Sequence, residues 1–337
     1  MIAHIMISEK FMPSFISLME QEFFHCEHQY LFITSEKYEF GLQPAPNIQF
    51  FHNDEDFESV LYTMRAAEKI ILHGLWREKI NLLLLSHPEL LKKCYWVMWG
   101  GDFYFPQRHS KAHHQVIKNV GYLVTGTQGE VDLVRKWYDA QGAHVASYVY
   151  TSNIVNDTIS LRELPENQRK VNILAGNSAA STNDHLFIFD KLRRYRNRIS
   201  NITVPLSYAV SGDKQYVANV ISRGKDIFGD QFIPLTRFLK LDQYNALISN
   251  VDIAIFAHNR QQGMGNIIHL LALGIKVYMR SDITVWQLFQ DLNIKVYDVN
   301  KVDLLPIDIN TAMKNHERVK EHFSRFTLIS QLEKLIH

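Results

Sequence analysis

Cysteine is almost absent from this sequence, which has only Cys26 and Cys94 among its 337 residues. Neither the C-x-x-C spacing of thiolate sites nor the cysteine density of a secreted disulfide framework is present. The sequence therefore predicts a protein of a reducing compartment. We also expect no metal site, because the adjacent pair His113 and His114 cannot share one face of a helix.

Excess charge and long apolar runs are also missing. The 36 Lys and Arg residues are balanced by 35 Asp and Glu residues, for a formal net charge of +1. A protein that binds nucleic acid through bulk charge carries a basic excess, so we expect no nucleic-acid partner. No apolar run reaches the roughly 18–20 residues that span a bilayer, and the first residues lack the features of a signal peptide. We therefore expect neither a transmembrane segment nor a signal peptide.

Several common active-site signatures are missing too. There is no G-x-S-x-G, no H-E-x-x-H, no complete G-x-G-x-x-G and no Walker loop. What the sequence does contain is a repeated alternation of short apolar runs and helical segments, which is typical of parallel α/β sheets. A length of 337 residues is long for one core, so we predict two doubly wound domains, over residues 1–155 and 166–310. A C-terminal helix over residues 311–337 is a candidate to pack back on the first domain.

The stretch that best defines a site runs from Val251 to Met279. Residues 252–257 predict a strand, 258–266 a polar loop and 267–273 a helix. Ligands of open α/β sheets bind where such loops leave the strands, and the free amides of a helix N-terminus favour anions. The loop could instead be a plain turn whose glycines serve geometry alone. Its candidate ligand-binding residues are Arg260, Gln261, Gln262, Gly263, Met264, Gly265 and Asn266.

Two further loops of the second half are expected at the same edge of the sheet. One contains Gly176, Asn177 and Ser178, a turn with small polar side chains. The other contains Tyr208, which could stack on a nucleotide base or simply cover the end of the sheet. Because loops at the carboxyl ends of parallel strands converge on one crevice, we predict that these residues share a site with the 258–266 loop.

In the first half, the segment Trp99-Gly100-Gly101-Asp102-Phe103-Tyr104 also follows a predicted strand. A carboxylate that is partly removed from water has a raised pKa and can act as a general base, which makes Asp102 a catalytic candidate. The alternative is an ordinary turn residue. His73 ends the neighbouring predicted strand and is the second candidate, since histidine titrates near neutrality.

These segments occur together, and in this order, in one known family. The relevant segments are Trp99–Tyr104, Gly176–Ser178 with Ser181–His185, Val204–Leu206 with Tyr208, and Arg260–Gly265. On them the chain resembles the TDP-N-acetylfucosamine:lipid II transferases, which add 4-acetamido-4,6-dideoxygalactose during enterobacterial common antigen assembly. The resemblance runs from about Ile70 to Tyr297. It departs at Trp99-Gly100-Gly101-Asp102, where the family pattern is WG-A-D.

The resemblance implies a GT-B fold, in which two Rossmann-like domains face each other across a cleft. It implies a metal-independent glycosyltransferase that uses a nucleotide-diphosphate sugar and no further cofactor. The C-terminal domain would bind the donor sugar, and the N-terminal domain would bind the acceptor, a polyprenyl-pyrophosphate-linked glycan. The protein would then act as a peripheral protein at the cytoplasmic face of the bacterial inner membrane, in surface polysaccharide assembly.

Residue roles follow from the same resemblance. The donor would be bound by the second-half residues named above, which are Gly176, Asn177, Ser178, Tyr208 and the loop from Arg260 to Asn266. Asp102, with His73 as second choice, would accept the proton of the acceptor hydroxyl in an inverting reaction. A retaining enzyme would need no such base. A membrane-facing surface would include Arg108, His109, Lys111 and His113.

Two other classes of protein stay open. One is a nucleotide-sugar-binding protein without turnover, for which neither Asp102 nor His73 would matter. The other is a GT-B enzyme of different chemistry, such as an epimerase, which would need no acceptor. An epimerase needs several carboxylates at this position, and the 99–104 segment contains one.

Overall fold

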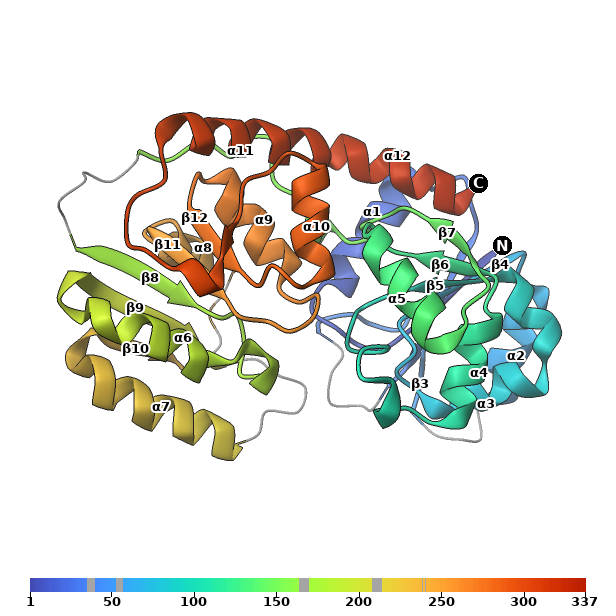
Figure 1. Cartoon of the computed structure of the whole chain (residues 1–337). Coiled ribbons are helices and arrows are strands. Elements are labelled where there is room, and N and C mark those ends of the chain that lie inside the picture. Colours follow the sequence, from blue (N-terminus) through green and yellow to red (C-terminus); the bar gives the residue numbers. More distant parts are fainter. Residues whose placement is uncertain (35–39, 53–56, 164–169, 208–213, 238, 240) are drawn as a thin grey trace. The chain divides into compact units, whose positions relative to one another are not determined.

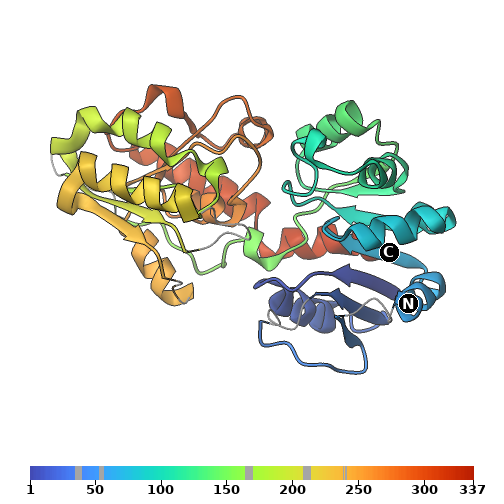
Figure 2. The same ribbon diagram turned by 90° about the horizontal axis from the view of Figure 1, so that it is seen from below.

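A computed structural model of the chain describes residues 1–34, 40–52, 57–163, 170–207, 214–237, 239 and 241–337 (Figure 1). The chain divides into two compact units. Unit 1 comprises Met1–Asn153 and Phe326–His337, and unit 2 comprises Ile154–Arg325. Each unit is a parallel sheet with helices on both of its faces (Figures 1 and 2).

The sheet of unit 1 has seven parallel strands within the described residues, in the order β3-β2-β1-β4-β5-β6-β7. Every residue of β1 is buried, as expected of a strand covered by helices on both sides. The strands are β1 (Ile2–Met6), β2 (His28–Ile33), β3 (Ile48–Phe51), β4 (Lys69–His73), β5 (Cys94–Val97), β6 (Tyr122–Val124) and β7 (Ala143–Val145). The helices are α1 (Met12–Glu22), α2 (Phe57–Ala66), α3 (Glu78–Ser86), α4 (Lys111–Asn119) and α5 (Gln128–Tyr138).

The sheet of unit 2 has six parallel strands in the described parts, in the order β10-β9-β8-β11-β12-β13. They are β8 (Val171–Ala175), β9 (Ile199–Pro205), β10 (Phe232–Leu235), β11 (Ile253–Phe256), β12 (Lys276–Met279) and β13 (Tyr297–Asp298). The helices are α6 (His185–Leu192), α7 (Lys214–Phe228), α8 (Leu241–Ile248), α9 (Met264–Ala272), α10 (Thr284–Asp291) and α11 (Ile309–His322). No helix of the described segments has both the length and the apolarity needed to cross a bilayer. The predicted α/β class, with two Rossmann-like sheets, is confirmed.

The strand order reverses once in each sheet. The chain enters at a central strand, β1 or β8, builds outward on one side and then returns to the other side at β4 or β11. In such sheets, ligands bind outside the carboxyl ends of the strands at the point of reversal. The loops after β1, β4, β8 and β11 are therefore placed to form binding sites, one in each unit.

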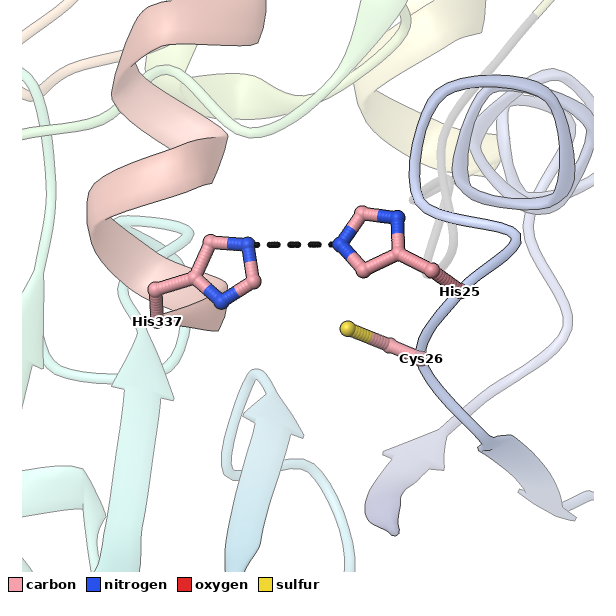
Figure 3. Close-up of side chains that lie close together, drawn as sticks. All are labelled: His25, Cys26 and His337. Carbon is pink, nitrogen blue, oxygen red and sulfur yellow. Dashed lines mark hydrogen bonds between the residues drawn. The ribbon is translucent and has the colours of Figure 1, made fainter.

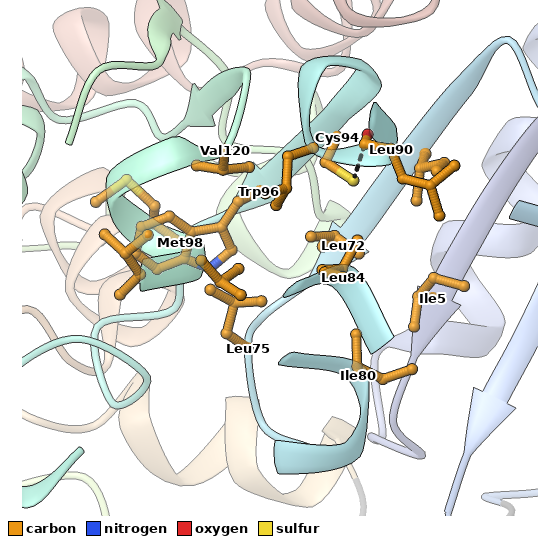
Figure 4. Close-up of a cluster of buried hydrophobic side chains, with 14 of the residues drawn as sticks. Ile5, Leu72, Leu75, Ile80, Leu84, Leu90, Cys94, Trp96, Met98 and Val120 are labelled. Atoms are coloured by element: carbon orange, nitrogen blue, oxygen red, sulfur yellow. Dashed lines mark hydrogen bonds between the residues drawn. The ribbon is translucent and has the colours of Figure 1, made fainter. Parts of the chain in front are cut away.

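Each unit has its own hydrophobic core. In unit 1, Leu72 of β4, Trp96 of β5 and Leu84 of α3 are fully buried members of one cluster (Figure 4). In unit 2, Ile255 of β11 and Phe189 of α6 belong to a second cluster. Burial of apolar surface, at about 25 cal/mol per Å², is the main favourable contribution to folding. The loops at each sheet edge are therefore carried on a close-packed base.

A buried ion pair holds β8 and β11 together at their amino ends. Arg162 Nη2 donates to Asp252 Oδ1 at 2.7 Å, and the two side chains are 14% and 2% exposed. Asp252 Oδ2 accepts the backbone N–H of Asn172 at 2.8 Å. A carboxylate can be buried this deeply because it is both paired and hydrogen-bonded. The ion pair therefore fixes the two strands whose other ends carry the candidate loops.

The C-terminal segment, expected as one helix, forms two helices that belong to different units. In α11, Asn315 Oδ1 accepts the backbone N–H of Lys295 at 2.7 Å, which ties this helix to unit 2. The next helix, α12 (Arg325–Ile336), belongs to unit 1. There, Lys69 Nζ at the start of β4 donates to the carbonyl of Leu335 at 3.1 Å. The last helix therefore ends near the start of β4 (Figure 1).

Candidate functional site

Two loops meet where the sheet of unit 2 reverses. One follows β8, and the other follows β11 and leads into α9. Gly176 in the first loop has a φ of +71°, and Gly263 in the second has a φ of +67°, both in the left-handed region that favours glycine. An added Cβ would lie 2.5 Å from His185 Nε2 at Gly176, and 2.9 Å from Asn177 Nδ2 at Gly263. Glycine is therefore required at both positions, for conformation and for space.

The buried side chain of Asn183 shapes the first loop and reaches the second. Its Oδ1 accepts the backbone N–H of Asn177 at 2.8 Å and lies 2.9 Å from Nε2 of His258, in the loop after β11. Its Nδ2 donates to Ser178 Oγ at 3.0 Å and to the carbonyl of Ala180 at 2.9 Å. Because the oxygen and the nitrogen of this amide are both engaged, the loop is held in one shape.

Gln262 joins the same two loops through its other contacts. Its Nε2 donates to Asn177 Oδ1 at 3.0 Å and to Ser178 Oγ at 3.2 Å. Its Oε1 accepts the hydroxyl of Thr182 at 2.7 Å. Both ends of the Gln262 amide are thus used inside the protein. The donor-binding role expected of Gln262 would require one of these bonds to open.

Two histidines lie buried beneath these loops. Burial, together with the nearby charge of Arg260, lowers the pKa of His258 to about 3, and burial lowers the pKa of His185 to about 4. The Tyr216 hydroxyl accepts the backbone N–H of His185 at 3.2 Å and lies 2.8 Å from its Nδ1. When that hydroxyl donates to Nδ1, the proton of the neutral ring is on Nε2, as assigned from the hydrogen-bond network. Nε2 has no partner among the described residues and faces Gly176.

Helix α9 begins directly after Gly263 without a side-chain cap. The first N–H groups of a helix have no acceptor within the helix, and the helix dipole adds partial positive charge there. Arg260, half-buried in the same loop, donates from Nη1 to the carbonyl of Gln261 at 3.0 Å. This end of the loop pair is therefore suited to a phosphate or diphosphate.

The other predicted residues of these loops offer different groups. Met264 is 6% exposed, so its side chain belongs to the core and only its backbone is left as a candidate ligand group. Gln261, Gly265 and Asn266 are partly exposed beside it. Tyr208 lies outside the residues that the structure describes.

In unit 1, Asp102 is buried, with 1% of its surface exposed. Its Oδ2 accepts Trp96 Nε1 at 2.8 Å and the backbone N–H of Leu75 at 3.1 Å, and its Oδ1 accepts the backbone N–H of Trp99 at 3.0 Å. Burial raises the pKa of the Asp102 carboxyl, and these hydrogen bonds oppose the rise. The carboxylate therefore ties the loop after β4 to the loop after β5.

His73 belongs to a buried chain of hydrogen bonds. Trp99 Nε1 donates to the Tyr150 hydroxyl at 2.9 Å, and that hydroxyl lies 2.7 Å from His73 Nδ1. His73 Nε2 lies 3.0 Å from His4 Nδ1, and His4 Nε2 lies 3.0 Å from His28 Nδ1. Burial lowers the pKa of all three rings, that of His73 to about 3. If the Tyr150 hydroxyl donates to His73 and each neutral ring donates to the next, then His28 Nε2 is the one ring nitrogen of these three histidines that lacks a partner among the described residues. Both nitrogens of His73 are then engaged.

Two indole rings lie at the same edge of the unit 1 sheet. Trp76, which is 38% exposed, packs over Gly74 and Gly101, where an added Cβ would meet the ring. Its ring centre lies 5.7 Å from that of Trp99, at an interplanar angle of 62°. Glycines at these two positions let the indole approach the backbone. Accessible aromatic surface beside a few ordered polar groups is typical of small-molecule sites.

Sequence reasoning placed Asn183 and His258 in the candidate loops but did not predict that they contact each other. They are separated by 75 positions in the chain, and nothing local in the sequence links them. The expected membrane-facing role of His113 is wrong, because its ring is buried and its Nε2 lies 2.7 Å from the carbonyl of Asp102. His113 instead supports the loop after β5.

Comparisons with known proteins bear on the family and on the fold. A model of the family described as 4-alpha-L-fucosyltransferase, glycosyl transferase group 56, matches residues 10–322. WaaG, a glycosyltransferase involved in lipopolysaccharide biosynthesis, is 10% identical, with a TM-score of 0.59 over 100% of this chain and 98% of its own. The lipopolysaccharide outer core galactosyltransferase WaaB is 12% identical, with a TM-score of 0.63 over 99% and 98%. A structure described as "Trehalose-6-phosphate from E. coli bound with UDP-2-fluoro glucose" is 8% identical, with a TM-score of 0.66 over 100% and 98%. At these identities the likeness shows the fold, and the predicted GT-B class is confirmed.

The neutral state of His258 predicts how stability depends on pH. The folded-state pKa of about 3 lies below the ordinary histidine value of 6.5. As the pH falls from 6.5 toward 3, the unfolded chain therefore binds a proton that the folded chain does not. Stability is fully present above pH 6.5 and is lost below it, by up to about 1.4 kcal/mol per pH unit for this group. In urea unfolding between about pH 8 and pH 5, the free energy of unfolding should fall less per pH unit for His258→Gln than for wild type. Equal slopes would contradict the assignment.

Proposed function

Because the chain belongs to the 4-alpha-L-fucosyltransferase family, glycosyl transferase group 56, we propose that it transfers a 4-acetamido-4,6-dideoxyhexose from a TDP-sugar to a lipid-linked glycan. The chain is a glycosyltransferase with a GT-B fold. The family description supports a 6-deoxyhexose donor, since fucose is a 6-deoxy sugar. The resemblance of the motifs to TDP-N-acetylfucosamine transferases supports the nucleotide and the 4-acetamido group.

The uncapped start of α9, beside two interlocked loops, is the observation that carries the donor part of the proposal. In glycosyl transfer the bond from the sugar to the diphosphate breaks, and negative charge develops on the leaving diphosphate. Amides of α9 and the Arg260 guanidinium would stabilise that charge without a metal ion. Because Asn183 and Gln262 hold the loops in one shape, little reorganisation is needed when the charge develops.

The two indole rings at the sheet edge of unit 1 support the acceptor part of the proposal. Trp76 presents an accessible indole over two glycines, and Trp99 lies next to it. Such a surface suits the apolar face of a sugar ring. The proposed acceptor is a glycan on polyprenyl pyrophosphate, reached from the cytoplasmic face of the bacterial inner membrane. The likeness to WaaG and WaaB, which are described as lipopolysaccharide transferases, supports a role in surface polysaccharide assembly.

Asp102 and His73 remain the proposed catalytic residues. Burial raises the pKa of Asp102, and a raised pKa makes a carboxylate a stronger proton acceptor. Each carboxylate oxygen has two lone pairs, so Oδ1 can accept from an acceptor hydroxyl in addition to the Trp99 amide. His73 would need to give up its contact with Tyr150 before its Nδ1 could act as a base.

Donor binding can be tested by thermal shift with TDP, UDP, GDP and ADP, with and without magnesium. TDP at a hundredfold excess over its Kd should stabilise the protein by about 2.7 kcal/mol, a Tm rise of roughly 5–11 °C, independently of magnesium. Gly263→Ala should weaken TDP binding at least about tenfold, because it strains a left-handed position and pushes on Asn177.

Gly229→Ala is the matched control for that variant. Gly229 also has a positive φ, of +57°, but its nearest neighbour for an added Cβ is Arg196 Nη2 at 3.6 Å. This variant should lose a similar amount of stability and keep the TDP shift. Absence of a shift with every nucleotide, or equal loss of TDP binding in the two variants, would refute the donor site.

The catalytic assignment is tested by kinetics of Asp102→Asn and His73→Ala. Loss of a general base should lower kcat by about a hundredfold or more. If Asp102 is the base, the acidic limb of the pH profile of kcat/KM should disappear in Asp102→Asn. A lower kcat with an unchanged profile would assign Asp102 to loop positioning alone. If both variants keep kcat near wild type, the base assignment is wrong.

The acceptor surface is tested by Trp76→Ala. Loss of the indole should raise the KM for the lipid-linked acceptor by about tenfold, the order expected for removing one aromatic contact. TDP binding should not change. Tyr62→Ala is the control, since Tyr62 on α2 is also an exposed aromatic residue, at 76%. A KM that responds equally in both variants, or in neither, would remove Trp76 from the acceptor site.

A further inference from the structure

A cluster of three potential metal ligands lies in unit 1, outside the two edges described above. His25 and Cys26 lie in the turn between α1 and β2, and His337 follows the end of α12. One ligand atom from each residue lies within 4.8 Å of the other two. Figure 3 shows the two imidazoles facing each other, with the Cys26 sulfur pointing toward the space between them.

The spacing of the two rings fits a shared cation better than a hydrogen bond. His25 Nε2 lies 3.4 Å from His337 Nε2, and the ring planes differ by 12° with centres 5.4 Å apart. Two nitrogens bound to one tetrahedral Zn²⁺, each at about 2.0–2.1 Å, lie about 3.3 Å apart. A nitrogen and a thiolate sulfur on the same ion lie about 3.6 Å apart. Because the three ligand atoms all lie within 4.8 Å of one another, the sulfur has to move by at most about an ångström, which a side-chain rotation can supply.

The backbone around the cluster is well anchored. In the turn, the N–H of Cys26 donates to the carbonyl of Phe23 at 3.0 Å. On the other side, the N–H of His337 donates to the carbonyl of Glu333 at 2.9 Å, so His337 extends the hydrogen bonding of α12. Lys69 fixes the same end of that helix through its bond to the Leu335 carbonyl. The three side chains are thus presented by fixed backbone segments that are 311 and 312 positions apart in the sequence.

We infer that His25, Cys26 and His337 form a zinc-binding site that fastens the end of α12 to the turn between α1 and β2. Two imidazoles and one thiolate are a normal ligand set for Zn²⁺, and a water molecule completes the tetrahedron because both histidines are exposed. On binding, the Cys26 thiol releases its proton to solvent and its sulfur bonds to the ion.

The site has a structural role and is independent of the proposed transfer reaction. Within unit 1, His25 and Cys26 precede β2 at the amino end of the parallel sheet, whereas Trp76 and Asp102 follow β4 and β5 at its carboxyl end. Zinc binding therefore predicts added stability for the attachment of α12, with no requirement for zinc during glycosyl transfer. If the protein does not bind zinc at these residues, the proposed glycosyl transfer is unaffected.

Cys26 can be followed by its reaction with an aromatic disulfide reagent, using the full chain. The only other cysteine, Cys94, is fully buried, and burial raises the pKa of its thiol to about 12, so it reacts slowly. Zn²⁺ should protect Cys26 from the reagent. In His25→Gln and in His337→Gln, the Zn²⁺ concentration for half protection should rise at least about tenfold, the smallest effect expected for a lost ligand. His322→Gln, which removes a histidine from α11, should leave it unchanged.

A second measurement identifies the ligand atoms directly. Co²⁺ in place of Zn²⁺ should give a thiolate-to-metal charge-transfer band that disappears in Cys26→Ser and weakens in both histidine variants. Circular dichroism of each variant without metal confirms that it has folded. Absence of protection by Zn²⁺, or protection that both histidine variants retain in full, would overturn the site; the second result would mean that the thiol alone binds the metal.

Discussion

The parallel pairing of β8 with β11 is the constraint on which the candidate donor site depends. These strands are far apart in the sequence, but the register places Ile255 beside Ala175, and the backbone N–H of Gly176 donates to the Ile255 carbonyl at 2.9 Å. The two loops that follow must then leave the sheet side by side. The Arg162–Asp252 pair fixes the opposite ends of the same strands, so the register of the two strands under the loops is held in place.

Both units use one buried polar side chain to join two loops at the sheet edge. In unit 1 the carboxylate of Asp102 binds the backbone amides of Leu75 and Trp99. In unit 2 the amide of Asn183 binds the Asn177 backbone and faces His258. A buried polar group that is fully hydrogen-bonded has only one satisfactory arrangement, because each broken bond leaves an unpaired group in an apolar setting. Such groups therefore hold both pairs of loops in one shape.

The histidines of the protein show how strongly burial determines the pKa and the role of a side chain. The sequence contains 16 of them, and a sequence alone suggests titration near neutrality for each. Burial instead keeps His73, His185 and His258 neutral, with lowered pKa values. His25 and His337, by contrast, are exposed and adjacent, which is the setting that a metal ion can use. Residues of one type therefore serve as hydrogen-bonding core groups in one place and as candidate ligands in another.

The sequence by itself determined the α/β class, the two doubly wound units, the family and the loops that carry the candidate site. Alternating apolar runs and helices encode these features locally, and Gly176 and Gly263 mark turns that only glycine can make. Only the tertiary structure decided that Gln262 joins the loops, that Asp102 is enclosed, and that the His25 turn meets the end of α12. Those outcomes depend on which distant segments become neighbours, and strand order and helix packing, not local composition, set those neighbours.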